Sequence, residues 1–153
     1  MSIRMIDPRG HRFGGALSAI LLAAAWSLQL PVLVALVAVS LAVSGFFGTR
    51  YSVLGRPWPF VRRALRLGPP AELEAELPPR FAQAFGAVVL GLAVVLFAAG
   101  FATGPWLLVA AVAGLQTVLA VTGYCLGCRL YGLRWYAPAV FDRLVRGPSQ
   151  AAR

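Results

Sequence analysis

The sequence has very little charge for its length. Only 12% of its 153 residues are charged, whereas soluble domains average about 25%. Lysine is absent, so all 14 basic residues are arginines, and five acids leave a net charge of +9. Hydrophobic residues make up 59% of the chain. This balance argues against a soluble globular domain and predicts a lipid bilayer as the surroundings.

Charge is missing altogether from two long stretches. No charged residue occurs from Phe13 to Gly48, which is 36 positions, or from Phe81 to Cys128, which is 48 positions. A membrane-spanning helix needs about 20 apolar residues, so each stretch is long enough for two helices. The lack of any acid within them argues against a proton-coupled transporter or pump, because those proteins use carboxylates as relays.

Proline divides each stretch in two. Pro31, close to Gln29, lies near the middle of the first stretch, and Thr103-Gly104-Pro105 divides the second. The sequence therefore predicts four spans at about 13–30, 32–48, 82–102 and 106–128, with a loop at 49–81 and a tail at 129–153. The expected fold is an all-α membrane protein, a four-helix transmembrane bundle that forms a single domain over residues 1–153.

The arginines predict the orientation of this bundle. Three lie in the arm at 1–12, six in the loop region and five in the tail, whereas the two turns within the stretches have none. Positive segments stay in the cytoplasm, so we expect a multi-pass protein of the cell membrane with both termini cytoplasmic. Nucleic acid is not an expected partner, because the arginines alternate with apolar runs and form no basic-aromatic reading surface.

Segments outside the spans are expected at the membrane surface. Residues 51–67 mix aromatic and apolar side chains with arginines, and residues 138–146 have the pattern of a short amphipathic helix. Between the loop's arginines and the third span, residues 68–79 carry proline pairs and three of the five acids. That composition predicts a solvated, partly extended linker.

A short pattern occurs twice. Arg12-Phe13 opens the first expected span and Arg80-Phe81 opens the third. Both halves begin on the cytoplasmic side, so two helical hairpins related as a parallel repeat are expected, with Arg12, Arg80, Arg50 and Arg129 around one cytoplasmic vestibule. The alternative, that an arginine next to an aromatic only marks the membrane interface, stays open.

Cysteine is scarce, and both cysteines lie in one motif. Cys125 and Cys128 form a Cys-x-x-Cys where the last apolar run meets Arg129. Residues three apart on a helix share a face, so the two sulfurs can approach if the last turn tightens or ends at Gly127. The spacing permits a reversible disulfide or a shared soft metal, and two small core hydrophobes are the alternative.

Four basic side chains are expected to support this pair: Arg129, Arg80, Arg12 and His11. Nearby arginines favour a thiolate, whereas the expected position at the C-terminal end of the fourth span opposes it, because the helix dipole is negative there. The single histidine could transfer a proton, but a solvated position at the membrane interface is the more ordinary expectation for it. No metal site is expected, since two thiolates and one histidine give three ligands at best. Dimerisation would complete a four-thiolate site, so a homo-oligomer stays open.

Three motifs together resemble a family of bacterial multi-pass membrane proteins known only as a domain of unknown function. They are Ile6-Asp7-Pro8-Arg9-Gly10-His11-Arg12-Phe13, Pro78-Pro79-Arg80-Phe81-Ala82-Gln83 and the Cys-Leu-Gly-Cys at 125–128. The resemblance covers most of the chain, from Ile6 to Tyr131. It implies a four-helix membrane protein with this cysteine pair and thioredoxin-like or rhodanese-like partners, and it implies no activity.

Two classes of function follow from these features. The first is a membrane-embedded thiol–disulfide redox or sulfur-relay protein, a thiol oxidoreductase if it is an enzyme, whose Cys125 and Cys128 exchange with a thioredoxin-like or rhodanese-like cytosolic partner. No cofactor is called for by the residues; a quinone in the bilayer would serve as the other redox terminus, but nothing in the sequence identifies a quinone site. The second class is a membrane scaffold or a small-anion or lipid-binding transporter with incidental cysteines.

Overall fold

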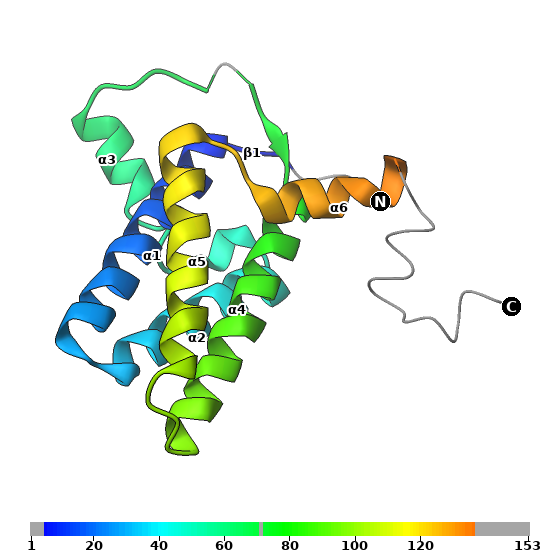
Figure 1. Ribbon diagram of the computed structural model, residues 1–153. Helices are drawn as coiled ribbons and strands as arrows, with labels where there is room; N and C mark the ends of the chain where they lie inside the picture. The colour runs from blue at the N-terminus through cyan, green and yellow to red at the C-terminus, as the bar shows by residue number, and fades with distance from the viewer. Residues whose placement is uncertain (1–4, 71, 137–153) are drawn as a thin grey trace, which may run out of the picture.

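The computed structural model describes residues 5–70 and 72–136, and these residues are mainly helical (Figure 1). The helices are α1 (Pro8–Leu28), α2 (Pro31–Phe47), the 3-10 turn η1 (Thr49–Tyr51), α3 (Trp58–Ala64), α4 (Leu77–Ala98), α5 (Gly104–Thr122) and α6 (Leu126–Tyr136). Two short strands, β1 (Met5–Ile6) and β2 (Glu74–Ala75), pair antiparallel. The expected all-helical fold is confirmed at this level, and the helix expected at 138–146 lies outside the described residues.

Two helical hairpins make up the body of the molecule. α1 and α2 form the first hairpin and α4 and α5 the second, and both hairpin turns lie at the same end (Figure 1). Pro31 opens α2 and Pro105 lies in the first turn of α5, where a missing backbone N–H costs no hydrogen bond. The prolines that divide the uncharged stretches therefore mark helix starts, as the sequence predicts.

Three expected boundaries were wrong. α1 begins at Pro8, capped by the Asp7 side chain, so His11 and Arg12 belong to a helix and not to a polar arm. The linker expected at 68–79 contains β2 and the start of α4. The fourth span was expected to reach Cys128, but α5 ends at Thr122. The last two differences follow from contacts between segments that are distant in the sequence, because β2 pairs with β1 and Arg12 caps α5.

The hairpins contact each other reciprocally. α1 packs against α5, and α4 packs against α2. Arg12 donates two hydrogen bonds to carbonyl oxygens in the last turn of α5, at 3.0 and 3.2 Å. Arg80 donates two to carbonyl oxygens in the last turn of α2, at 2.8 and 3.2 Å. The carbonyls at a helix C-terminus lack intrahelical partners, so each arginine caps a helix of the other hairpin.

The aromatic residue next to each arginine also has an equivalent contact. Phe13 packs against Trp58 of α3, and Phe81 packs against Tyr131 of α6, both with ring centroids 5.7 Å apart. α3 and α6 are the short helices that follow the two hairpins. The pattern that occurs twice in the sequence therefore makes equivalent contacts in both halves, as a parallel repeat requires.

A close helix crossing joins α2 to α4. A Cβ at Gly45 would lie 2.7 Å from the backbone nitrogen of Ala84, so only glycine allows this approach. Ser44 donates a hydrogen bond to Gln83 at the same crossing. The core extends from there between the four long helices and contains mainly small and branched side chains, with the largest of them at Leu22, Leu41, Leu90 and Trp106.

Large apolar side chains also cover the outside of the helices. α4 and α5 are each long and apolar enough to cross a membrane, and α2 is a shorter apolar helix. Less than a third of the most apolar window of either helix is buried, at 22% and 28%. Water-soluble monomers rarely expose apolar surface on this scale, which favours contact with lipid.

Candidate functional site

The cysteine motif lies between α5 and α6, where the chain turns sharply. Gly123 ends α5 with a left-handed backbone, at a φ of 74°, and its N–H donates to the carbonyl of Leu119. A Cβ at Gly123 would lie 3.4 Å from the guanidinium of Arg12. Glycine is therefore favoured by the left-handed backbone conformation, and the arginine that caps α5 lies in van der Waals contact with this position. α6 then begins at Leu126 and leaves the bundle at a steep angle to α5 (Figure 1).

Cys125 occupies the cap position at the N-terminus of α6. Its carbonyl accepts a hydrogen bond from the N–H of Arg129 at 3.1 Å, and its Sγ accepts one from the N–H of Cys128 at 3.2 Å. The two sulfurs are joined in a disulfide, with the Cα atoms 5.1 Å apart. The expectation that the motif sits at a helix C-terminus was wrong. The positive end of the α6 dipole faces the sulfurs and favours a thiolate there.

A close contact holds the disulfide over the start of α4. Gly127, between the cysteines, lies so near Ala82 that an added Cβ would be 2.6 Å from its Cβ and 2.9 Å from its Cα. No larger residue fits at this crossing of α6 and α4. The Cys-x-Gly-Cys therefore combines a sulfur pair with the one residue type that allows α6 to pack there.

His11 lies beside the cysteine pair and not in solvent. A ring nitrogen of His11 and the sulfurs of Cys125 and Cys128 all lie within 4.8 Å of one another. Both ring nitrogens are shielded from solvent and have no hydrogen-bond partner within the described part of the chain. Burial lowers the pKa of His11 from 6.5 to about 4, because the charged imidazolium loses its hydration. The ring is therefore neutral at pH 7, and the solvated position expected from the sequence was wrong.

The expected arginine vestibule is only partly assembled. Arg12 lines a cavity together with Cys125, and Arg129 lines another with both cysteines while its guanidinium lies 5.3 Å from the ring centroid of Tyr124. Arg80 is held at the end of α2 and lines neither of these cavities, and Arg50 faces a different cavity. Two of the four arginines are thus near the sulfurs, and Arg80 is a helix-capping residue.

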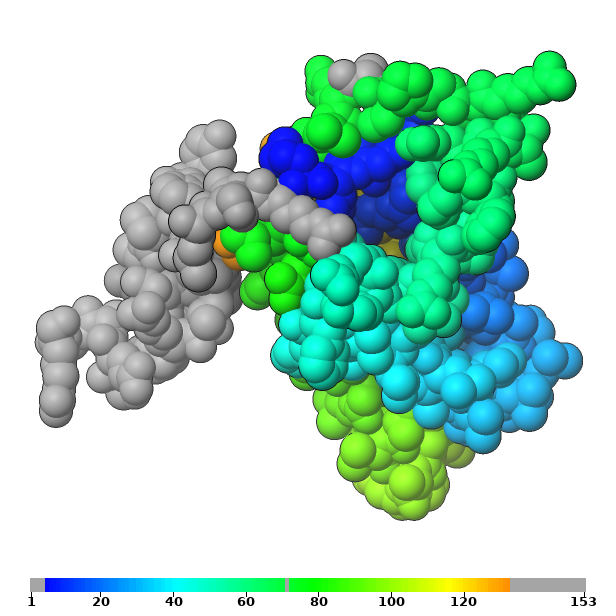
Figure 2. Space-filling model, turned by 180° about the vertical axis from the view of Figure 1, so that it is seen from behind, coloured from blue at the N-terminus to red at the C-terminus, as the bar shows by residue number. Residues whose placement is uncertain are grey.

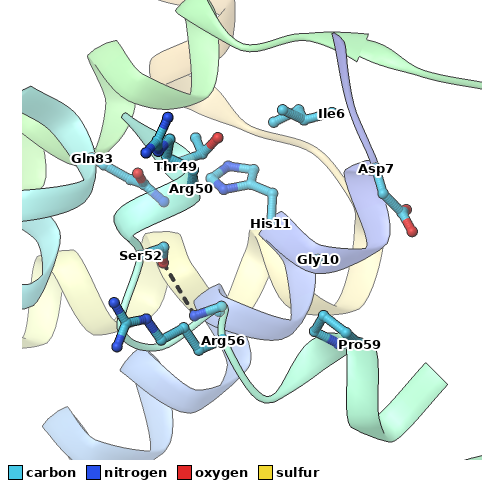
Figure 3. Close-up of a pocket in the computed structure, with 12 residues that line it drawn as sticks. Ile6, Asp7, Gly10, His11, Thr49, Arg50, Ser52, Arg56, Pro59 and Gln83 are labelled. Atoms are coloured by element: carbon cyan, nitrogen blue, oxygen red, sulfur yellow. Dashed lines mark hydrogen bonds between the residues drawn. The ribbon is translucent and has the colours of Figure 1, made fainter. Parts of the chain in front are cut away.

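A cavity of about 310 Å³ lies on the other side of His11. The His11 ring enters it from α1, opposite Thr49 and Gln83 (Figure 3). Arg50 and Arg56 also line it. From behind, the hollow is visible with the start of α1 at its floor, between the segment that follows α2 and the chain leading to β2 (Figure 2). The imidazole therefore stands between a basic cavity and the disulfide.

A second, apolar cavity of about 170 Å³ lies between α4, α5 and α6. His11 and Cys125 line one end of it, with Gln83 and Gln116 as its other polar residues. The disulfide therefore borders both a polar space and an apolar one.

A family model described as a domain of unknown function (DUF4395) matches residues 6–135. The chain belongs to this family. The match confirms the expectation of a domain of unknown function, and it spans His11 and both cysteines. No curated protein and no solved structure matches the chain.

The proximity of His11 to the cysteines is the main feature that the sequence does not reveal. More than a hundred residues separate the histidine from the motif. The sequence gives one indirect signal. The single histidine is next to Arg12, and the repeat predicts that Arg12 lies at the same end of the bundle as the cysteine motif. The packing of α1 on α5 brings the two segments of the DUF4395 domain together.

The lowered pKa of His11 predicts a pH dependence of stability. An unfolded chain protonates His11 below pH 6.5 and the folded one only near pH 4, so stability is fully present above pH 6.5 and is lost as the pH falls from 6.5 towards 4. His11 precedes the apolar run that begins at Phe13 and so lies outside the expected spans. The shift corresponds to at most about 3 kcal/mol, at about 1.4 kcal/mol per pKa unit.

Thermal unfolding of the disulfide form in detergent at pH 7 and pH 4.5 measures this effect. A His11→Gln variant keeps a polar side chain but cannot titrate, so its melting temperature is expected to fall less between the two pH values. The five acids titrate in both proteins and cancel in the comparison. Equal losses in the parent and the variant would show that His11 stays solvated.

Proposed function

We propose that this chain is a membrane-embedded thiol–disulfide redox or sulfur-relay protein whose reactive pair is Cys125 and Cys128. The observation that carries the proposal is a Cys-x-x-Cys closed into a disulfide at the N-terminus of α6, beside a neutral and shielded His11. Both cysteines are partly exposed, so a partner's sulfur can reach them. A packing role alone would require neither the helix N-terminus nor the histidine.

We also propose that α2, α5 and the uncharged parts of α1 (from Phe13) and α4 (from Phe81) are four membrane spans, with both chain termini in the cytoplasm. The exposed apolar surface of these helices supports this arrangement. The uncharged hairpin turns lie at one end of the bundle, and Arg12, Arg80 and Arg129 lie at the other. Under the positive-inside rule, the end with the arginines and cysteines faces the cytoplasm.

The exchange with a thioredoxin-like partner takes two steps. A thiolate of the reduced partner attacks Sγ of Cys128, and the Cys125 sulfur leaves as a thiolate that keeps the hydrogen bond from the Cys128 N–H. The partner's second thiolate then attacks the partner's first sulfur, which is bonded to Cys128 in the mixed disulfide, and Cys128 leaves as a thiolate. The partner's dithiol is oxidised to a disulfide, and Cys125–Cys128 takes up the two electrons.

Sulfur relay would use the same pair in its reduced form. The Cys128 thiolate takes the outer sulfur from the persulfide of a rhodanese-like partner, whose cysteine leaves as a thiolate. The Cys125 thiolate then attacks Sγ of Cys128, which forms the disulfide and expels hydrosulfide. A thioredoxin-like protein restores the dithiol by the exchange described above.

Single serine variants test this proposal. Mild oxidation of the purified protein should remove both alkylatable thiols through one intramolecular disulfide, and a thioredoxin-like protein should restore them. Under mild oxidation, Cys125→Ser should trap a mixed disulfide through Cys128 with a thioredoxin-like partner whose own second cysteine is changed to serine, because neither chain then has a second sulfur to resolve it. Cys128→Ser is the matched control and should trap much less, since the sulfur that we expect to be attacked is missing.

A second candidate function rests on the 310 Å³ cavity. Arg50 and Arg56 line it together with Ser52 and one acid, Asp7, and the excess of positive charge suits a small anion or a lipid headgroup. A membrane scaffold or anion transporter would use this cavity and leave the cysteines incidental. If both single serine variants stay fully active in the host and neither traps a partner, this second function is favoured.

A further inference from the structure

Three potential metal ligands converge at the cysteine pair. One ring nitrogen of His11 and the sulfurs of Cys125 and Cys128 lie within 4.8 Å of one another. A tetrahedral zinc site with ordinary bond lengths places such atoms about 3.5 to 3.8 Å apart, at Zn–S and Zn–N distances of about 2.3 and 2.0 Å. Once the disulfide is reduced, movements of about 1 Å would bring all three atoms to a common centre.

The His11 side chain supplies a second, independent indication. Both of its ring nitrogens are shielded from solvent and neither has a hydrogen-bond partner among the described residues. Buried polar atoms are rarely left without a partner, and such a group calls for a specific explanation. A neutral imidazole presents one unprotonated nitrogen, which is the form that binds metals.

We propose that in the reduced protein His11, Cys125 and Cys128 bind one Zn²⁺ ion and leave a fourth coordination position open. Two thiolates, one imidazole and an open position match the donor set of a catalytic zinc site. The two thiolate charges neutralise the divalent ion, which limits the cost of placing it in a partly buried site. Soft thiolate ligands also select Zn²⁺ over Mg²⁺ or Ca²⁺.

Polar groups line the space on one side of the cysteine pair. Glu74 of β2 lines both cavities that Cys125 borders on this side, and Arg129 lines one of them. A water molecule on the metal could therefore be hydrogen-bonded by a carboxylate.

The disulfide form has no thiolates, so metal binding is restricted to the reduced state. The proposal requires only reduced thiols and no protein partner, so it stands apart from the proposed exchange function.

Metal titration of the full-length protein in detergent tests the site. Reduced protein should take up one Zn²⁺ per chain in competition with a chromophoric chelator, and the disulfide form should take up none. His11→Ala should weaken the affinity by at least about tenfold, since even ligand-orienting neighbours cost 10- to 100-fold. His11→Cys should restore it by supplying a third thiolate. Both variants must unfold as cooperatively as the parent on heating in detergent, which shows that the fold is kept.

Spectroscopy on the unmodified protein makes the test independent of the variants. X-ray absorption at the zinc edge should show two sulfur ligands and at least one imidazole nitrogen per Zn²⁺. One Zn²⁺ per two chains with four sulfur ligands would overturn the proposal in favour of a site shared by a dimer. Equal affinity in the parent and His11→Ala, or binding of Cu⁺ with no binding of Zn²⁺, would overturn it as well. Failure to trap a partner with Cys125→Ser would leave all of these results unchanged.

Discussion

A Gly127→Ala variant is expected to lose the packed cysteine site. The added Cβ would lie 2.6 Å from the Cβ and 2.9 Å from the Cα of Ala82, and the α4 backbone cannot yield at that point. α6 would therefore have to move away from α4 and carry Cys125 and Cys128 away from His11. Overpacking of this kind costs about 1–3 kcal/mol. Because about 1.4 kcal/mol is a factor of ten in a population, the alkylation rate of the reduced cysteines should rise at least about fivefold.

Gly132→Ala is the matched control for this experiment. Gly132 lies in the same helix, and a Cβ added there would meet no atom within 4 Å. Alanine is the better helix former by up to about 1 kcal/mol, so this variant should keep the parent's alkylation rate and melting temperature or improve slightly on them. If Gly127→Ala behaves like Gly132→Ala, then α6 does not pack on α4 and the proposed site does not form.

Reporter fusions are expected to give an all-or-none result for orientation. A cytoplasmic reporter fused after Arg153 or inserted near Glu74 should be active, and alkaline phosphatase at the same points should be inactive. The physical reason is the placement of all 14 arginines outside the uncharged turns. A phosphatase inserted at Gly100, in the turn between α4 and α5 where a Cβ would meet open space, should be active and serves as the control.

The opposite result would change the chemistry as well as the topology. Active phosphatase after Arg153 or near Glu74 would place Cys125 and Cys128 on the oxidising side of the membrane. A stable structural disulfide would then be the default state of the pair. In a reducing cytosol the dithiol should instead dominate at rest, with the disulfide formed under oxidant or during turnover.

The helical hairpins could be predicted from the sequence because their signals are local. The uncharged stretches favour helices, and Pro31 and Pro105 can be accommodated only near a helix start. The repeated Arg-Phe pairs could also be recognised, since a repeat needs no knowledge of contacts. Which carbonyls the arginines bind could not be predicted. Arg80 was expected to support the thiols, but its nearest unpaired acceptors are the last carbonyls of α2.

The sequence by itself determined that the chain is an apolar helical protein with one cysteine pair at a polar boundary. Only the tertiary structure decided what surrounds that pair. Both Gly123 and Gly127 could have ended α5; the capping of α5 by Arg12 selects Gly123 and leaves Gly127 for the contact with α4. The motif thereby moves from a helix C-terminus to a helix N-terminus. His11 reaches the sulfurs only because α1 packs on α5, and a contact across more than a hundred residues leaves no local trace in the sequence.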